Sequence, residues 1–175
     1  MLYAQRHGSH QPCWNVRVEP CRHGLGLFAA SSFAAHDVIL IFEGPEINFR
    51  QMLSKGELEA NALQVQADLY LDLLPPGVYA NHSCRPNAGI LNDRTLIALE
   101  SIKAGEEITY DYSTTMWENH WTMACRCGAS NCRRVVKDFP LLPRLVQQRY
   151  LRLGIVQSFI SRRLFQSQRS VIRPH

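Results

Sequence analysis

The stretch "YANHSCRPNAG", Tyr79–Gly89, lies near the middle of a chain of 175 residues. Its segment "NHSC", Asn81–Cys84, places four polar side chains in a row within an otherwise apolar region. A proline and a glycine follow within five residues, which is typical of a loop. A plain loop gives no reason for an amide, an imidazole, a hydroxyl and a thiol to stand side by side. Patterns elsewhere in the chain are needed to distinguish a turn from a functional site at this segment.

The composition predicts one globular domain with a sizeable core, because 46% of the residues are hydrophobic. No apolar run approaches the roughly 18 residues that a membrane span needs. The N-terminal segment "MLYAQRHGSHQPCW" lacks the apolar region of a secretory signal peptide. We therefore expect an intracellular protein without a membrane contact.

Charge is spread unevenly along the chain. All fifteen acidic residues lie at or before Asp138, whereas residues 139–175 carry seven arginines and no acid. This basic tail has two interpretations. It either contacts an anionic partner such as nucleic acid, or it forms the solvated face of an amphipathic helix that packs on the body or in a homodimer.

The pattern of apolar residues predicts a mainly β (α+β) body followed by helix. Short strands are expected at residues 24–30, 37–44 and 69–74, and one or two short helices between residues 49 and 63. The segments "TLIALESI" and "EEITYDY", joined by "KAGE", predict a β-hairpin. From Leu141 to about Phe165, apolar residues recur three and four apart, which predicts a helix weakened or broken at Gly154.

The segment "CRCGASNC" holds three cysteines within eight residues: Cys125, Cys127 and Cys132. Thiolates are soft ligands that Zn²⁺ binds tetrahedrally, so three of them leave one coordination position open. Cys84, His82 and His120 are the candidates for it, and Cys84 would complete a structural site of four thiolates. A nucleic-acid-binding zinc knuckle remains an alternative if His120 is the fourth ligand.

Two further patterns are uninformative by themselves. "GEEITYDY" carries Tyr110 and Tyr112, two residues apart, which on a strand would face the same side. "GLGLF" begins with Gly24 and Gly26, a spacing that most often belongs to a turn. Core packing and turn formation explain each pattern when it is taken alone.

Taken together, the four patterns are specific. The order GxGLFA, NHSCxPN, GEExxxDY and CxCx4C resembles the SET-domain protein lysine methyltransferases, over about Val16 to Arg134. The resemblance implies a fold of small twisted sheets around a knot-like NHSC segment, and the helical C-terminal tail lies outside it. The implied organisation is an N-terminal extension (1–15), a SET domain (16–114), a zinc-binding post-SET segment (115–138) and the basic tail (139–175).

The resemblance also implies the site. S-adenosylmethionine would be bound by Gly24, Leu25, Gly26, Asn81, His82 and Tyr112. One structural zinc ion would be held by Cys84, Cys125, Cys127 and Cys132. The catalytic residues would be Tyr112, beside the transferring methyl group, and Tyr110, which matches the position that tunes product number. Tyr70 is a candidate lining residue of the lysine channel.

The implied function is methyl transfer from S-adenosylmethionine to a lysine of a histone or another basic protein. A tyrosine at position 110 resembles the family members that mainly add one methyl group. The action would be cytoplasmic or chromatin-associated. The alternative is a non-catalytic zinc-containing adaptor that binds partners or nucleic acid through its tail, but such a module has no chemical need for Asn81, His82 and Tyr112 together. In the family, the segment that corresponds to residues 48–79 recognises the substrate. Here this segment is short, and it does not identify the target protein.

Overall fold

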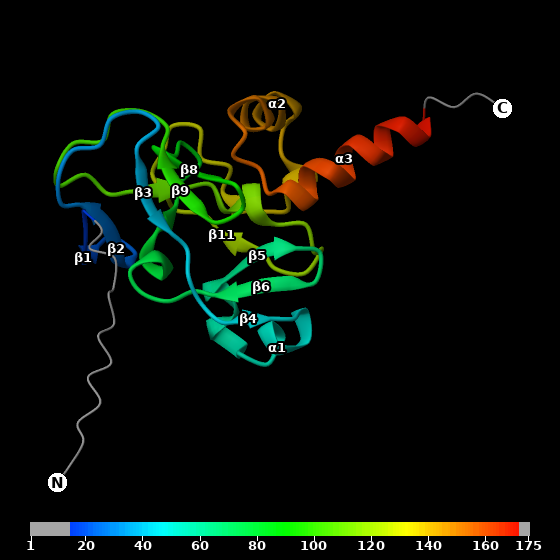
Figure 1. Cartoon of the computed structure of the whole chain (residues 1–175), viewed down its shortest axis with the longest axis horizontal. Helices are drawn as coiled ribbons and strands as arrows, with labels where there is room; N and C mark the ends of the chain where they lie inside the picture. Colours follow the sequence, from blue (N-terminus) through cyan, green and yellow to red (C-terminus); the bar gives the residue numbers. More distant parts are fainter. Residues whose placement is uncertain (1–14, 172–175) are drawn as a thin grey trace, which may run out of the picture.

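The computed structural model describes residues 15–171, which form several small β-sheets and a C-terminal pair of helices (Figure 1). The mainly β prediction is therefore confirmed. Two three-stranded antiparallel sheets make up the centre. Their strand orders are β3 (Val38–Ile41), β9 (Thr95–Ala98), β8 (Ala88–Leu91) and β4 (Glu46–Ile47), β6 (Leu69–Asp72), β5 (Ala62–Gln66).

Three two-stranded sheets surround this centre. They are β1 (Val16–Cys21) with β2 (Gly24–Ala29), β7 (Asn81–His82) with β10 (Thr109–Tyr110), and β11 (Met123–Ala124) with β12 (Val135–Val136). Gly24 opens β2 at φ +105°, a backbone conformation that favours glycine.

The helical elements are short until the C-terminus is reached. In chain order they are α1 (Phe49–Leu53), the 3₁₀ turns Gly56–Asn61, Gly77–Tyr79, Tyr112–Thr115 and Phe139–Leu141, then α2 (Arg144–Leu153) and α3 (Ser158–Val171). The expected short helices between residues 49 and 63 are present. Asn48 caps α1 by exchanging hydrogen bonds with Gln51, each 2.9 Å long.

The main core lies where the sheets meet. Buried side chains of β2, β3, β5, β6, β8 and β9 form one apolar cluster that includes Leu27, Leu40, Leu63, Leu71 and Leu96. Each of these strands therefore turns apolar side chains inward, and the NHSC segment and β10 lie beside the same cluster.

The predicted hairpin is wrong. The turn forms, since the backbone amide of Glu106 donates to the carbonyl of Lys103 at 3.1 Å, but the two flanking segments diverge. β9 pairs with β3 and β8, while β10 runs parallel to β7. Between the turn and β10, Ile108 donates its amide hydrogen to the carbonyl of Leu27 in β2 at 2.7 Å. A tight turn reverses the chain, but longer-range partners decide which strands pair.

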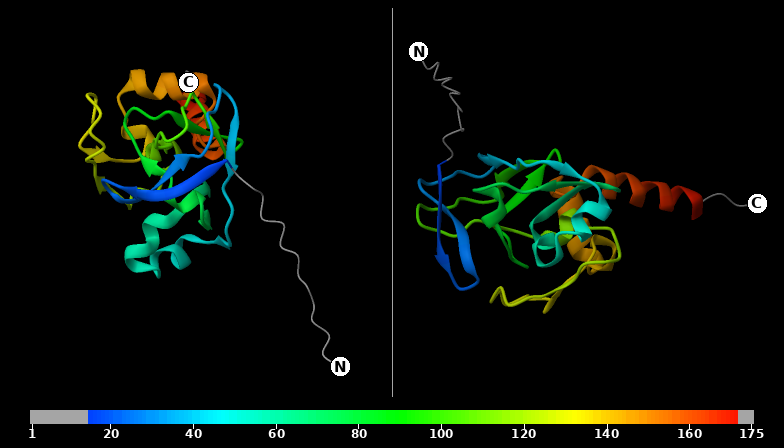
Figure 2. Two further views of the ribbon diagram at one scale, coloured as in Figure 1. Left: turned by 90° about the vertical axis from the view of Figure 1, so that its left-hand side faces the viewer. Right: turned by 90° about the horizontal axis from the view of Figure 1, so that it is seen from below.

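The C-terminal helices pack on the body. Gly154, in the left-handed conformation at φ +69°, ends α2, so the predicted break is confirmed. A second apolar cluster holds the pair in place through Phe139, Leu142, Tyr150, Ile155, Val156, Phe159 and Ile160. The far end of α3 projects away from the body (Figure 2). The prediction that the tail packs on the body is thus confirmed for the residues that the structure describes.

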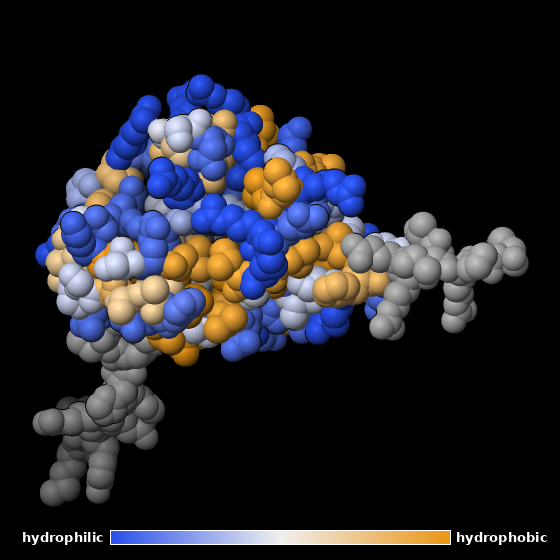
Figure 3. All heavy atoms as spheres, turned by 90° about the horizontal axis from the view of Figure 1, so that it is seen from above, coloured by the Kyte–Doolittle hydropathy of each residue, from blue (hydrophilic) through white to orange (hydrophobic). Residues whose placement is uncertain are grey.

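The face seen in Figure 3 is mostly hydrophilic, with apolar residues gathered in patches across its middle. Leu145 of α2 is 79% exposed and Phe165 of α3 is 59% exposed. Among residues 15–171, no helix combines the length and apolar character that crossing a membrane requires.

Candidate active site and cysteine cluster

The NHSC segment and the GEExxxDY segment form one unit through β7 and β10. Asn81 lies beside Thr109 and His82 beside Tyr110 in the parallel pairing. Asn87 clamps the two segments together, because its Oδ1 accepts from the Thr109 amide at 2.9 Å and its Nδ2 donates to the Glu107 carbonyl at 2.8 Å. The second asparagine of NHSCxPN thus has a structural role that the sequence did not reveal.

Asn81 ties β2 to this unit. Its Nδ2 donates to the Leu25 carbonyl at 3.0 Å and to Glu107 Oε1 at 2.9 Å. A Cβ atom on Gly26 would lie 2.7 Å from that carboxylate oxygen and 3.2 Å from Asn81 Nδ2. A side chain at position 26 would therefore have to displace the Glu107 carboxylate and crowd Asn81.

The two tyrosines lie together, although only Tyr110 is on a strand. Tyr112 begins a 3₁₀ turn, and its ring centroid is 4.8 Å from that of Tyr110. The Tyr112 hydroxyl donates to the Ala80 carbonyl at 3.0 Å. Burial raises the pKa of both phenols well above the ordinary value, so both are neutral near pH 7.

Two cavities meet at Tyr112. The first cavity, of about 40 Å³, is lined by Tyr70, Tyr110, Tyr112, Glu118 and Trp121 among others. The second cavity, of about 210 Å³, is lined by His23, Asn81, His82, Tyr112, Cys125 and Cys127 among others. Tyr112 is the one residue that lines both. Tyr112 therefore forms part of the wall between the two spaces.

The site residues predicted from sequence divide between these spaces. Asn81, His82 and Tyr112 line the second cavity, and Tyr70 lines the first. Residues 24–26 do not line the second cavity, whereas the neighbouring His23 does. They support it through the contact between Leu25 and Asn81.

The cysteines converge from two parts of the chain. Cys84 Sγ lies 3.8 Å from Cys125 Sγ, which in turn lies 3.6 Å from Cys132 Sγ. The ligand atoms of His82, Cys84, Cys125 and Cys127 all lie within 4.8 Å of one another. A tetrahedral site with Zn–S bonds of about 2.3 Å separates its sulfur atoms by about 3.8 Å. The cluster therefore has the spacing and the donor chemistry of a metal site.

Burial raises the pKa of the Cys84 and Cys125 thiols, because their thiolate forms are poorly solvated there. A divalent cation would supply the positive charge that these thiolates need. His120, the alternative ligand, is not in the cluster. Its Nε2 instead lies 3.4 Å from Glu59 Oε2.

His82 connects the cysteine cluster to the tyrosines. Its Nδ1 accepts from the Tyr112 amide at 3.2 Å, and its Nε2 lies 3.3 Å from Cys84 Sγ. Burial lowers its pKa to about 4, so the ring is neutral near pH 7. Because Nδ1 is an acceptor, the single proton is on Nε2 and points to the sulfur. His82 is thus a hydrogen-bond donor to Cys84.

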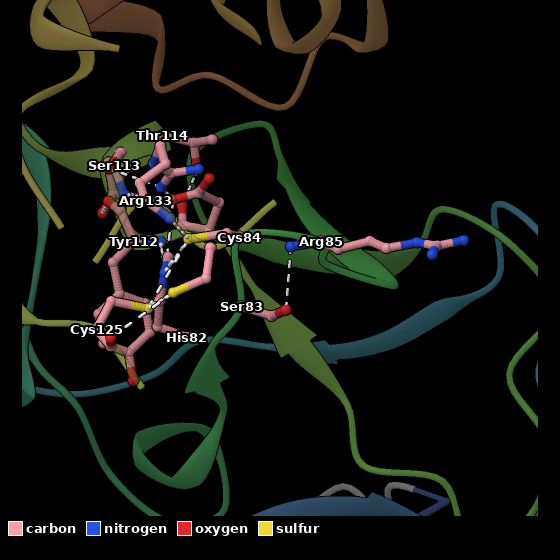
Figure 4. A network of polar contacts seen from close by, with 12 residues as sticks. His82, Ser83, Cys84, Arg85, Tyr112, Ser113, Thr114, Cys125 and Arg133 are labelled. Carbon is pink, nitrogen blue, oxygen red and sulfur yellow. Dashed lines mark hydrogen bonds and ion pairs between the residues drawn. The ribbon is translucent and has the colours of Figure 1, made fainter. Parts of the chain in front are cut away.

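Asp111, between the two tyrosines in sequence, is the centre of a buried polar network. Figure 4 labels its partners Ser113 and Arg133. Its Oδ1 accepts from Arg133 at 2.7 Å and from the Ser113 amide at 3.1 Å. Its Oδ2 accepts from the hydroxyl of Tyr150, in α2, at 2.9 Å. Asp111 is the aspartate of GEExxxDY, but the motif does not show its partners, because Arg133 and Tyr150 lie 22 and 39 residues further along the chain. The network joins the C-terminal helices and the cysteine segment to the tyrosines.

Residues 24–113, just over half of the chain, match the family described as "SET domain". The chain belongs to the SET-domain family. The predicted resemblance is confirmed on the segment that contains the glycines, NHSC and both tyrosines.

Relatives of this SET-domain chain are histone-lysine N-methyltransferases by name. It is 29% identical over 147 residues to "Histone-lysine N-methyltransferase ASHH3" of Arabidopsis thaliana, covering 74% of this chain and 39% of that protein. It is 32% identical over 128 residues to "Histone-lysine N-methyltransferase trr" of Drosophila melanogaster, covering 63% of this chain and 5% of that protein. The chain thus spans well under half the length of these relatives.

A solved structure shares the fold. It is described as "crystal structure of KRYPTONITE in complex with mCHG DNA and SAH", and it superposes with a TM-score of 0.56 at 20% identity. The match covers 71% of this chain and 29% of that one. At this identity the likeness supports the fold alone, and it confirms the SET-domain architecture predicted from sequence.

Proposed function

We propose that this chain is a protein lysine methyltransferase that uses S-adenosylmethionine. The observation that carries the proposal is the pair of cavities that share Tyr112. Methyl transfer needs two reactants that approach a common point from separate sides, so that each can bind and leave independently. The second cavity would hold the methyl donor, and the first would admit the lysine side chain. The names of the relatives point to the same reaction.

When bound, S-adenosylmethionine supplies a methyl group on a positively charged sulfur atom. This chain's own contribution is mainly alignment, which lowers the barrier by holding the reactants in line. Tyr112 is fixed by its hydrogen bond to the Ala80 carbonyl and sits where the cavities meet. Its hydroxyl oxygen and nearby carbonyl oxygens would orient a methyl group through weak C–H···O contacts. The apolar and aromatic lining of the first cavity would favour the neutral, nucleophilic amine by excluding water.

The cysteine cluster would hold one structural zinc ion through Cys84, Cys125, Cys127 and Cys132. Both measured sulfur–sulfur separations fit tetrahedral coordination. His82 is the competing ligand by position, but the proton on Nε2 suits a hydrogen bond to the Cys84 thiolate better than a bond to the metal. The ion would fasten the segment from Cys125 to Cys132 beside the second cavity, as the lining of that cavity by Cys125 and Cys127 suggests.

Monomethylation would be the main outcome, because of Tyr110. The residue is 6% exposed and lines the first cavity, and no described residue forms a hydrogen bond with its hydroxyl. That hydroxyl is free to hold a water molecule in the space that an added methyl group would need. A tyrosine here would therefore oppose a second transfer.

The substrate class that fits best is a histone or another basic protein, and the setting would be chromatin. The exposed arginines of α2 and α3 would provide electrostatic attraction to nucleic acid, and such attraction weakens steeply with salt. Those that the structure describes are Arg144, Arg149, Arg152, Arg162 and Arg163. Salt-dependent retention of the full chain on heparin is the measurement for this contact. A homodimer through the tail stays a prediction that sedimentation can test.

The decisive experiment combines binding with turnover. Calorimetric titration with S-adenosylmethionine tests the second cavity, and labelled cofactor with core histones tests transfer, with mass spectrometry of the labelled band. A methyltransferase binds the cofactor and labels a lysine, and Tyr112→Phe abolishes labelling but not binding. A chain that binds no cofactor and labels no protein is instead the non-catalytic adaptor.

A further inference from the structure

The first cavity contains a fixed carboxylate that the proposed chemistry has not used. Glu118 lines this cavity, and one of its oxygens, Oε2, accepts from the Tyr70 hydroxyl at 2.5 Å. Tyr70 is 2% exposed and belongs to β6, 48 residues earlier in the chain. The backbone amide of Glu118 donates to Asp138 Oδ2 at 3.1 Å. Both the side chain and the backbone of Glu118 are therefore held in place.

The lining of the first cavity holds no cation, and the basic residue just outside it is His120, which lies 3.4 Å from Glu59 Oε2 and lowers the pKa of Glu118. The residues that line the first cavity include Glu59 and Glu118 but no lysine, arginine or histidine. Burial raises the pKa of Glu118, and the nearby Asp138 raises it further. Asp138 is itself 3% exposed, and its Oδ1 has no hydrogen-bond partner among the described residues. A half-buried carboxylate without a cation is costly unless a ligand brings one.

The hydroxyl of Tyr110 is a second polar group in the first cavity. The Tyr110 side chain is buried to more than nine-tenths, and its hydroxyl makes no hydrogen bond to any described residue. The cavity thus offers a carboxylate and a free phenol hydroxyl among aromatic and apolar side chains. This combination matches an alkyl chain that ends in a cation.

We propose that Glu118, positioned by Tyr70, binds the ammonium group of the lysine side chain as it enters the first cavity. The inference rests on the proposed function, which brings a lysine to this cavity. Glu118 would be a residue of substrate specificity, since it favours a cationic side chain over a neutral one of the same length. Tyr70 would be a positioning residue, because its hydroxyl, together with a backbone hydrogen bond from Trp121, holds the Glu118 carboxylate in the cavity lining.

The contact would act from the moment the lysine binds. Lysine arrives protonated in water, and the carboxylate offsets the loss of hydration as the ammonium leaves the solvent. Transfer itself requires the neutral amine, but the nitrogen regains positive charge as the methyl group is transferred to it, so the attraction to Glu118 acts on the bound lysine and on the transition state alike. Loss of Glu118 should therefore raise KM and leave kcat nearly unchanged.

A binding test that needs no known substrate uses two small probes. n-Butylammonium copies the end of a lysine side chain, and 1-butanol is its neutral counterpart of the same size. NMR titration of the wild-type chain should show that butylammonium binds about tenfold more tightly than butanol. A tenfold difference in Kd corresponds to about 1.4 kcal/mol of binding free energy. Glu118→Gln should remove this preference, and Tyr70→Phe should reduce it. Glu57→Gln, at an exposed glutamate outside the cavity lining, is the matched control and should retain it.

Turnover provides the second test, with an N-terminal peptide of histone H3 as the probe, because three of the relatives are named H3 lysine-4 specific. Glu118→Gln should raise the peptide KM about tenfold, with kcat and cofactor affinity within about twofold of wild type. Equal affinity of the wild type for the two small probes overturns the inference, and so does an unchanged KM in Glu118→Gln. Selective binding of butylammonium by a chain that methylates no histone counts against the proposed function, and leaves the cation site standing.

Discussion

Replacing Tyr150 with phenylalanine tests whether the C-terminal helices are part of the catalytic unit. The substitution keeps the ring, which is 2% exposed in the second apolar cluster, and removes only the hydroxyl that donates to Asp111 Oδ2 at 2.9 Å. No other described residue donates to that oxygen, so a buried carboxylate oxygen loses its partner. A hydrogen bond to a charged group contributes about 1.5–3 kcal/mol to stability.

We therefore expect Tyr150→Phe to lower the free energy of unfolding by about 2 kcal/mol. For a domain of this size, 1 kcal/mol shifts the melting temperature by roughly 2–4 °C, so the expected decrease is roughly 4–8 °C. Scanning calorimetry of the full chain measures it. Because Asp111 lies between Tyr110 and Tyr112, kcat at 20 °C below the melting temperature should also fall several-fold, at saturating cofactor.

Tyr79→Phe is the matched control. Tyr79 is half-buried, and its hydroxyl makes no hydrogen bond to any described residue. A decrease in melting temperature no larger than that of Tyr79→Phe would refute the stabilising role of the Tyr150 hydroxyl. If the melting temperature decreases as expected but kcat is unchanged, the Tyr150 hydroxyl contributes to stability only, and the C-terminal helices do not affect catalysis through it.

Four other predictions concern the tyrosines, the metal and a glycine. Tyr112→Phe should lower kcat by orders of magnitude with cofactor affinity near wild type, as stopped assays and calorimetry would show; retained activity would contradict it. Tyr110→Phe should shift the product toward di- and trimethyl-lysine, because a methyl group in a tight space is worth roughly 1–3 kcal/mol; an unchanged mass spectrum at completion would count against the assignment. Elemental analysis should find one zinc per chain, and Cys127→Ser or a chelator should weaken cofactor binding; less than half a zinc in fresh protein would disprove the site. Gly26→Ala should weaken cofactor binding, because the new methyl group would lie 2.7 Å from Glu107 Oε1 and displace Asn81; unchanged affinity would show that Asn81 does not hold the cofactor.

Several features of this chain could be predicted from sequence because they depend on local chemistry. The spacing of Cys125, Cys127 and Cys132 already places three thiols within one loop. The period of apolar residues in the tail reports a helical face, and Gly154 marks its break because glycine tolerates the left-handed conformation. The order of motifs identifies the family because each motif retains the residue types that its chemistry requires.

Pairing between distant segments is what only the tertiary structure decided. The turn at residues 103–106 reverses the chain wherever it occurs, but Asn87 and β2 determine that β10 joins β7 instead of β9. In the same way, Asp111 accepts hydrogen bonds from Arg133 and Tyr150, which are 22 and 39 residues away in sequence. Local propensity extends over three or four residues, whereas these contacts arise because buried polar groups must find partners wherever packing brings them. The family and the clustered cysteines could therefore be recognised from the sequence alone. The strand pairing of β10, the network around Asp111 and the carboxylate of Glu118 in the first cavity depended on long-range packing.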